Sequence, residues 1–305
     1  MPDGAYRGAL GAVAALFVIL LVAFVTSIVI QARPAFAHFG LSFLTSTKWD
    51  PVHVHYGVLV FLVGTLETTL IAMAIAVPIG LGGALALAFG VPQRLRMTLG
   101  TAVELLAAVP SVVYGLWGLL VVAPWVRTII EPALAKITGG HGPFGGSQLG
   151  VGLLLAGVIL AIMVLPTMVA ISRDVLMAVP EVEIEGAFAL GATRWQVMRR
   201  VVVPSARAGI LGATTLATGR ALGETIAVTM VIGNTDHFTH SLFGTTQTMA
   251  SLIANEFTEA TEPFHLASLI AVGVLLLVVS VVINLVARLL VRSVGRQRAL
   301  GIGVL

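Results

Sequence analysis

Long runs of hydrophobic residues dominate the pattern of apolar and polar positions along this chain of 305 residues. About 20 apolar residues form a helix long enough to cross the hydrocarbon core of a bilayer. Six segments meet this length, and we predict helices at 8–30, 63–89, 99–123, 149–171, 208–232 and 264–290. The pattern therefore predicts an all-α integral membrane protein with about six transmembrane helices.

The first apolar run has an alternative interpretation as a cleavable signal peptide. Ala35-Phe36-Ala37 resembles a small-x-small cleavage site. However, the uncharged run 8–30 is longer than the 7–15 residues of a signal-peptide core, and only Arg7 precedes it as a basic residue. A retained transmembrane helix is therefore favoured.

Composition supports a membrane protein and removes several other classes. Hydrophobic residues make up 58% of the chain and charged residues 10%, whereas soluble domains average roughly 45–50% and 25%. The chain has no cysteine, which excludes disulfides, thiolate metal sites and a cysteine nucleophile. The histidines show no helical metal-ligand spacing, so no metal site is assigned.

Basic residues are distributed unevenly between the two sides of the predicted membrane. With six spans, both termini lie on one side. Four basic residues fall on the opposite side and Arg220 lies within a span. The other twelve lie on the side of the termini: Arg7, Arg94, Arg96, Arg173, Arg194, Arg199, Arg200, Arg207, Arg288, Arg292, Arg296 and Arg298. Because basic residues accumulate on the cytoplasmic side, both termini are predicted to be cytoplasmic.

The segment 172–207 is the longest cytoplasmic stretch between spans, and it predicts a helix–turn–helix. Pro180 suits the start of a helix, and Glu181 follows in the first turn, where the helix dipole favours anions. Gly191 suits a left-handed stop. Thr193 can cap a second helix, which Pro204 is expected to end. On this pattern alone, an amphipathic connector lying on anionic lipid remains an alternative.

A motif within this segment resembles a known family. Glu185-Gly186-Ala187, then Gly191, then Val201-Val202-Val203-Pro204 resembles the EAA motif of importer-type ABC permeases. The departures are Gly186 for alanine, Val201 for isoleucine and Val203 for leucine, and all keep a small or apolar side chain. In that family the segment is a coupling helix that docks on a cytoplasmic ATPase. The resemblance therefore implies ATPase coupling through Glu185, Ala187, Gly191 and Pro204.

Two further blocks, 104–118 and 219–234, are similar to stretches of phosphate permeases. The Ala-Val-Thr-Met run after Glu224, together with Asn255-Glu256-Phe257, resembles the PstC type of phosphate permease rather than its PstA partner. The likeness extends over about 56–291. It implies a MetI-like fold and three domains: an N-terminal helix with an outer loop (1–55), the permease domain (56–291) and a basic cytoplasmic tail (292–305).

The same resemblance implies the partners and the energy source. They are a homologous permease of the PstA type, two ATPase subunits of the PstB type and an extracytoplasmic phosphate-binding protein of the PstS type, assembled at the inner membrane. The glycine-rich stretch 139–146 lacks the Gly-Lys-Ser/Thr of a P-loop. We therefore expect no cofactor on this chain, and ATP hydrolysis on the partner chains, so the subunit itself is not an enzyme.

Arg220 and Glu224 are the candidate substrate-path residues. Arg220 lies near the middle of the predicted span 208–232, where an arginine normally faces a partner or a water-filled path. Glu224 follows one helical turn later on the same face. Either the two form a structural ion pair, or Arg220 contacts the passing anion while Glu224 holds the guanidinium. Thr225 and Thr229 either line the path or bond their own helix backbone.

The remaining intramembrane acids receive weaker assignments. Glu104 is expected to pair with Arg94 or Arg96 across a short turn, and Glu67 has no assigned role. Two rival functions stay open. One is the same machinery carrying another oxyanion such as sulfate. The other is an ion-coupled secondary transporter with Glu67, Glu104, Arg220 and Glu224 as a proton relay.

Overall fold

A computed structural model describes residues 2–139 and 141–299 of the protein. Six helices in this part of the chain are long and apolar enough to cross a membrane: Tyr6–Phe39, Leu59–Gly90, Ser111–Ile137, Leu153–Met177, Arg194–Leu222 and Pro263–Leu289. The predicted all-α architecture with six spans is therefore confirmed. The positions of the third and fifth spans differ from the prediction.

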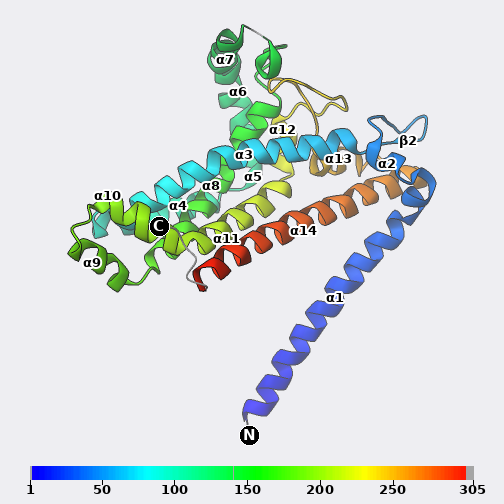
Figure 1. Ribbon diagram of the computed structural model, residues 1–305. Coiled ribbons are helices and arrows are strands. Elements are labelled where there is room, and N and C mark those ends of the chain that lie inside the picture. The colour runs from blue at the N-terminus through cyan, green and yellow to red at the C-terminus, as the bar shows by residue number, and fades with distance from the viewer. Residues whose placement is uncertain (1, 140, 300–305) are drawn as a thin grey trace.

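Four long helices form the body of the molecule and run side by side (Figure 1). They are α3 (Leu59–Leu85), α8 (Leu153–Met177), α11 (Val203–Leu222) and α14 (Pro263–Ala299). The helix α8 packs against α3 and α11, and α11 packs against α14. Of the predicted basic tail, residues 292–299 continue α14 and residues 300–305 lie outside the described residues.

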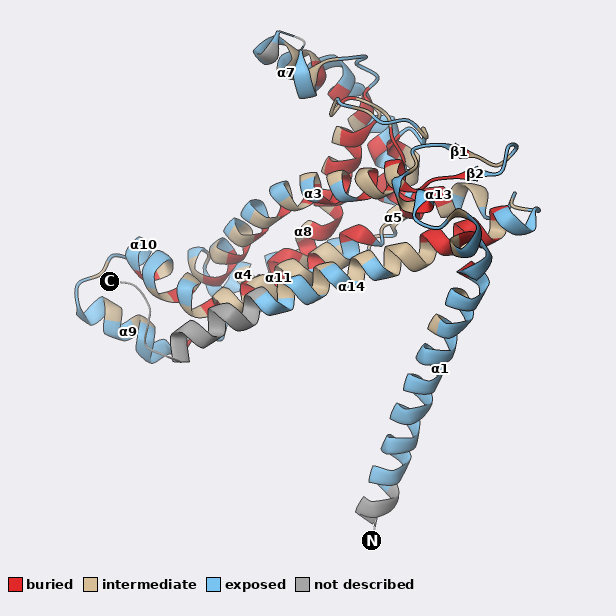
Figure 2. Ribbon diagram, turned by 45° about the vertical axis from the view of Figure 1, so that its right-hand side comes forward, coloured by how far each residue is buried: buried red, intermediate tan, exposed pale blue. Residues whose placement is uncertain are grey.

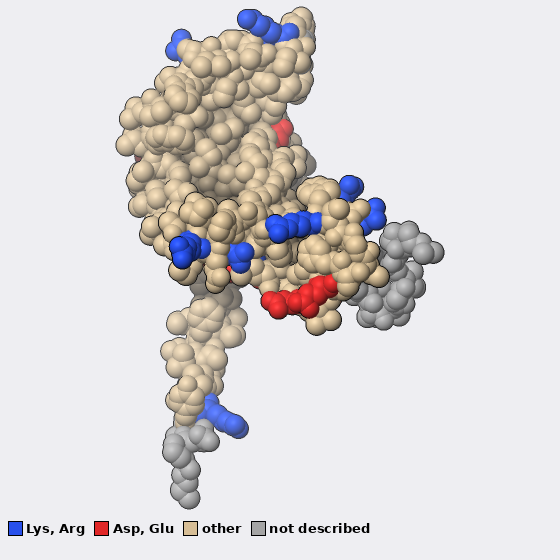
Figure 3. All heavy atoms as spheres, turned by 90° about the vertical axis from the view of Figure 1, so that its left-hand side faces the viewer, with Lys and Arg blue, Asp and Glu red and all other residues tan. Residues whose placement is uncertain are grey.

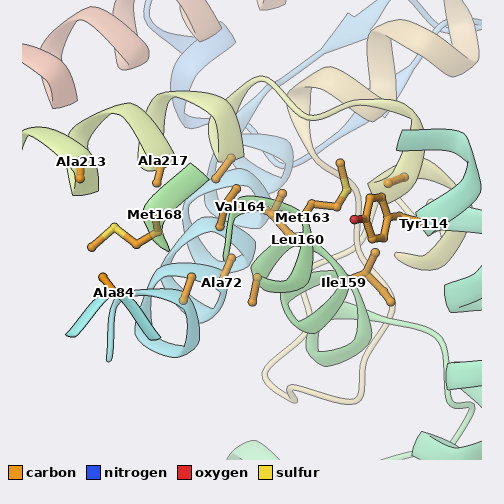
Figure 4. Close-up of a cluster of buried hydrophobic side chains, with 14 of the residues drawn as sticks. Ala72, Ala84, Tyr114, Ile159, Leu160, Met163, Val164, Met168, Ala213 and Ala217 are labelled. Carbon is orange, nitrogen blue, oxygen red and sulfur yellow. The ribbon is translucent and has the colours of Figure 1, made fainter. Parts of the chain in front are cut away.

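Small residues let these helices approach closely. A Cβ atom added at Gly80 of α3 would lie 2.6 Å from the Met168 side chain of α8. A Cβ added at Gly157 of α8 would lie 2.4 Å from Ile71 of α3. Figure 4 shows the resulting core, in which Met168 of α8 lies near Ala213 and Ala217 of α11. Because lipid is as apolar as these side chains, close packing rather than exclusion of water holds such helices together.

The helix α1 (Pro2–Phe39) departs from the body for most of its length (Figure 2). Among its described side chains only those near the C-terminal end are buried, where Ala32 and Ala35 share a core cluster with Ala267 and Leu269 of α14. Its apolar residues from Tyr6 to Ile30 are largely exposed, as suits a helix whose surroundings are lipid or another membrane subunit.

A second core closes the end of the body opposite the predicted cytoplasmic segment. It joins α1, α2 (Ser42–Thr45), the hairpin of β1 (Trp49–Asp50) and β2 (His55–Tyr56), α13 (Met249–Glu256) and α14. The pairing is antiparallel, with Trp49 opposite Tyr56. At the exposed tip of the hairpin, a hydrogen bond to the His53 side chain lowers the pKa of Asp50. We call this region the outer cap.

A partly buried carboxylate ties the outer cap together. One oxygen of Glu256, at the end of α13, accepts hydrogen bonds from Trp49 Nε1 at 2.8 Å and lies 2.8 Å from His265 Nε2. The Tyr56 ring stacks on His265. Burial raises the pKa of the Tyr56 hydroxyl. This network links the hairpin to α13 and α14 through the buried Trp49 and His265 side chains and the partly buried Glu256 carboxylate.

The predicted third span 99–123 was wrong in position. Residues Gln93–Ala107 form a separate helix, α4, and the span begins with α5 (Ser111–Trp117). It continues through α6 (Ala123–Trp125) and α7 (Glu131–Thr138). Pro110 causes the break, because it lacks an N–H group and disfavours a helical conformation at Val109. The Tyr114 hydroxyl donates to the Leu106 carbonyl at 2.8 Å and so ties the two helices across the break.

The fifth span was also misplaced at both ends. The helix does not end at Pro204: α10 (Arg194–Val197) continues through a π-helical segment, Met198–Val202, into α11. The wider turn before Pro204 accommodates its missing N–H. At the other end α11 stops at Leu222, and a separate short helix, α12, spans Ile226–Val231. The break at Gly223 therefore separates Arg220 from the residues that follow Glu224.

Candidate translocation site and coupling face

Arg220 lies in the last turn of α11 and presents an exposed side chain. One of its terminal nitrogens donates a hydrogen bond to the Thr167 hydroxyl of α8 at 3.3 Å. The guanidinium also lies within electrostatic range of the Tyr114 hydroxyl on α5. Three helices therefore meet around this cation, which keeps most of its five donor N–H groups open.

Glu224 does not hold Arg220, contrary to one of the two interpretations of the sequence. Its Oε1 accepts a hydrogen bond from the Ala227 backbone N–H at 3.3 Å, in the first turn of α12. The carboxylate therefore satisfies an otherwise unpaired donor at a helix start. No ion pair joins Arg220 to an acid among the described side chains. The structure thus leaves the charge of Arg220 without a carboxylate partner.

The hydroxyls of Thr225 and Thr229 are bonded to nearby backbone. Thr225 donates to the Gly223 carbonyl at 3.2 Å, and Thr229 donates to the Thr225 carbonyl at 2.8 Å. This is the arrangement that threonines in membrane helices commonly adopt. Their hydroxyl oxygens remain as acceptors, so a role in the substrate path stays a prediction.

A row of threonines on α3 faces the same break from the other side. Thr65, Thr68 and Thr69 are buried and, with Glu224 and Thr248, line a narrow space behind the break. Thr65 and Thr68 donate to backbone carbonyls of α3, and Thr65 also accepts from the Met249 backbone N–H. Sequence analysis missed this row. Thr68 and Thr69 follow Thr65 by three and four positions, and this spacing could have predicted that the three hydroxyls share one face of the helix.

Glu104 pairs with a different cation from the one expected. Its carboxylate lies 3.4 Å from Arg173 of α8, not beside Arg94 or Arg96. Arg173 also contacts the neighbouring Asp174 at 2.9 Å. A Cβ added at Gly100 would lie 2.4 Å from a terminal nitrogen of Arg173, so glycine leaves room for the guanidinium in its present position against α4.

The predicted helix–turn–helix is present at the end of the body opposite the outer cap. The helix α9 (Glu181–Ala189) begins after Pro180, as predicted. Gly191 adopts a left-handed conformation with φ +82°. Thr193 caps α10, because its hydroxyl accepts from the Gln196 N–H while the Gln196 side chain accepts from the Thr193 N–H. Each local prediction for this turn except the role of Pro204 is confirmed.

The candidate coupling residues lie on an open face around this turn. Glu185 and Gly191 are exposed, Ala187 is half-buried, and nothing lies within 4 Å of a Cβ added at Gly186. Between α9 and α10 a groove of about 280 Å³ is lined by Phe89, Ile184, Phe188, Arg194, Val197, Met198 and Val202. Lys and Arg side chains form a band across this end, with a group of acidic side chains beside them (Figure 3).

The acidic outer loop is partly occupied by internal contacts. Glu256 is bonded to Trp49 and His265 within the outer cap, and Asp236 pairs with His237. Glu259 and Glu262 remain exposed. A groove of about 500 Å³ in the same region has a mixed lining of hydroxyl, charged, aromatic and glycine residues: Gly146, Ser147, Leu149, Thr235, Asp236, His237, Phe238, Thr239, Ser241, Phe243, Gly244 and Thr245.

Comparison with known proteins assigns the family. A model described as binding-protein-dependent transport system inner membrane component matches residues 76–296. This range includes α11, α12 and the coupling face, and it covers most of the chain. The chain therefore belongs to the family of binding-protein-dependent transport system inner membrane components.

Individual relatives agree with this assignment. The chain is 43% identical to the phosphate transport system permease protein PstC of Mesorhizobium japonicum, over 97% of this chain and 92% of the relative. It is also 43% identical to the PstC protein of Pasteurella multocida, over 93% and 90% of the two chains.

A solved structure supports the fold. The inward-facing MetNI methionine ABC transporter matches 81% of this chain and 99% of its own chain, with a TM-score of 0.58 and 20% identity. The protein therefore has the MetI-like fold of an ABC importer permease. At this level of identity the likeness concerns the fold alone.

Proposed function

We propose that this chain is the PstC-type permease subunit of an ATP-driven phosphate importer. The observation that carries this proposal is the exposed Arg220, which has no carboxylate partner among the described residues, in a chain whose relatives are named phosphate permeases. A guanidinium can donate several hydrogen bonds to the oxygens of one phosphate. A single cation binds the ion weakly enough for it to leave again, as translocation requires.

The proposed mechanism divides the work between two ends of the molecule. At the break between α11 and α12, Arg220 contacts phosphate, and the oxygens of Thr225 and Thr229 line the path beside Glu224. At the other end, Glu185, Ala187 and Gly191 form the face that docks an ATPase subunit, and Pro204 lies within the helix that leads from this face to Arg220. The continuous helix from Arg194 to Leu222 supports this division, because a rigid helix can transmit motion of the docking face to the path.

The proposed assembly contains a homologous permease of the PstA type, two ATPase subunits of the PstB type and a phosphate-binding protein of the PstS type. Both termini are proposed to be cytoplasmic. The basic band around α9 and α10 supports this orientation, since such residues accumulate on the cytoplasmic side. ATP binds to the ATPase subunits, and the permease provides the path.

The test is reconstitution of these components in liposomes. We expect uptake of radiolabelled phosphate that requires both this chain and ATP, and that persists when a protonophore removes the proton gradient. Uptake that continues without the ATPase subunits but stops with the protonophore would favour the ion-coupled secondary transporter instead.

A further inference from the structure

We propose that Thr167 is a positioning and anion-contacting residue of the translocation path, which orients the Arg220 guanidinium and adds a hydroxyl donor beside it. This inference rests on the proposed function, because it assigns a second residue to the same anion site. The starting point is the hydrogen bond from Arg220 to the Thr167 oxygen, which joins α11 to α8 across 53 residues of sequence.

The contact between Arg220 and Thr167 differs chemically from the Arg220–Glu224 ion pair that the sequence suggested. A carboxylate would neutralise the guanidinium, whereas a hydroxyl oxygen is neutral and leaves the full positive charge in place. The contact uses one of the five N–H donors and thereby limits the rotation of a long side chain. Restricting that rotation before the anion arrives lowers the entropic cost of binding it.

The Thr167 hydroxyl also has an unused proton. Other threonines of the region donate to backbone carbonyls: Thr214 to Ile210, Thr215 to Leu211, Thr218 to Thr214 and Thr229 to Thr225. Among the described residues no hydrogen bond takes the proton of Thr167, whose oxygen accepts from Arg220. An O–H donor with a bonded oxygen, next to a cation, suits a tetrahedral oxyanion, which presents several acceptor oxygens in a small volume.

The location of Thr167 fits a contact that forms and breaks during transport. It follows Pro166, a proline inside α8, at which the helix loses one backbone hydrogen bond. Arg220 lies in the last turn of α11, directly before the break at Gly223. Both partners therefore lie at weak points of their helices, where a small relative movement changes their separation.

The test compares Thr167→Val with Thr167→Ser in the complete transporter. Valine keeps the shape but removes the hydroxyl, and serine keeps the hydroxyl. The matched control is Thr218→Val on α11, because the Thr218 hydroxyl is already bonded to its own helix. We expect Thr167→Val to lower the maximal rate of phosphate uptake about tenfold, which corresponds to about 1.4 kcal/mol. Membrane abundance and binding of the ATPase should be unchanged, and Thr167→Ser and Thr218→Val should transport at nearly the parental rate.

A double-mutant comparison separates this role from simple packing. In an Arg220→Lys background, which should keep some uptake, Thr167→Val should cause a smaller fold loss than in the parent, because the two residues act on the same anion. Full transport by Thr167→Val, or equal fold losses in the parent and in the Arg220→Lys background, would overturn the inference while leaving phosphate uptake by the parent intact. Failure of the parent complex to take up phosphate at all would instead overturn the proposed function.

Discussion

At the scale of single residues, the proposed phosphate path depends on the charge of Arg220, which has no acidic partner among the described residues. Because Glu224 bonds the start of α12 and not the guanidinium, removing Arg220 leaves no orphaned acid. We therefore expect Arg220→Gln to insert and assemble normally, and to lose phosphate uptake. Arg220→Lys should also transport poorly, because an ammonium does not reproduce the planar guanidinium fork. The measurements are membrane abundance, co-purification of the ATPase and uptake.

The double variant Arg220→Gln with Glu224→Gln is the control for this prediction. If the two residues formed a structural ion pair, each single variant would be unstable, because removing one partner leaves the other charge buried and unpaired. The double variant would then regain stability and transport. The present geometry predicts that the double variant folds and remains inactive. Parental uptake by the double variant would restore the structural interpretation of these residues.

Gly191 gives a second prediction at this scale. Its φ of +82° is unfavourable for any residue with a side chain, although no atom lies within 4 Å of an added Cβ. The cost of Gly191→Val is therefore backbone strain of about 1–2 kcal/mol and not a clash. We expect this variant to stay in the membrane but to bind the ATPase less well and transport less. Gly191→Asn is the control, since asparagine tolerates this conformation, and equal ATPase binding by Gly191→Val and the parent would argue against a docking role.

At the scale of helices, the sequence predicted local structure well where a single residue type decides it. The start of α9 after Pro180, the stop at Gly191 and the cap at Thr193 follow from backbone chemistry within a few residues. The break before α5 was also readable, since Pro110 interrupts the predicted span, but continuous hydrophobicity concealed it. The contacts Arg220–Thr167 and Arg173–Glu104 join residues 53 and 69 positions apart, and no local pattern encodes such pairs.

The outer cap provides a prediction about the stability of these elements. Glu256→Ala would leave the Trp49 indole N–H and the His265 ring without their shared acceptor. Each buried group left unsatisfied costs about 1–3 kcal/mol. We expect a clear fall in the thermal unfolding temperature of the purified protein in detergent. Glu259→Ala is the control, because Glu259 is exposed in the same loop. Equal unfolding temperatures for the two variants would show that the network does not stabilise the cap.

At the scale of the whole molecule, orientation in the membrane is testable because the chain has no cysteine. A variant such as Gln93→Cys, at the start of α4, or His141→Cys, in the loop after α7, therefore carries a single reactive thiol. With both termini cytoplasmic, His141→Cys should react with a membrane-impermeant maleimide in intact cells. Gln93→Cys should react only after the membrane is permeabilised. The reverse pattern would invert the proposed topology.

The overall architecture was predictable because its signals are spread over the whole chain. Six long apolar segments and the asymmetry of basic residues both survive small errors in any boundary. The break between α11 and α12 could not be predicted in this way, because no signal spread along the chain marks it. It depends on Gly223 together with the side-chain bond from Glu224 to Ala227, and a hydropathy pattern does not contain such a bond.

Substrate competition in the reconstituted ATP-driven complex tests most directly whether this permease carries phosphate. The liposomes are given radiolabelled phosphate at a limiting concentration. A large excess of unlabelled phosphate should then suppress accumulation of the label, whereas the same excess of sulfate should leave it unchanged. Radiolabelled sulfate should remain at background. Accumulation of labelled sulfate, or suppression of phosphate uptake by sulfate, would contradict the assignment of this chain to phosphate import.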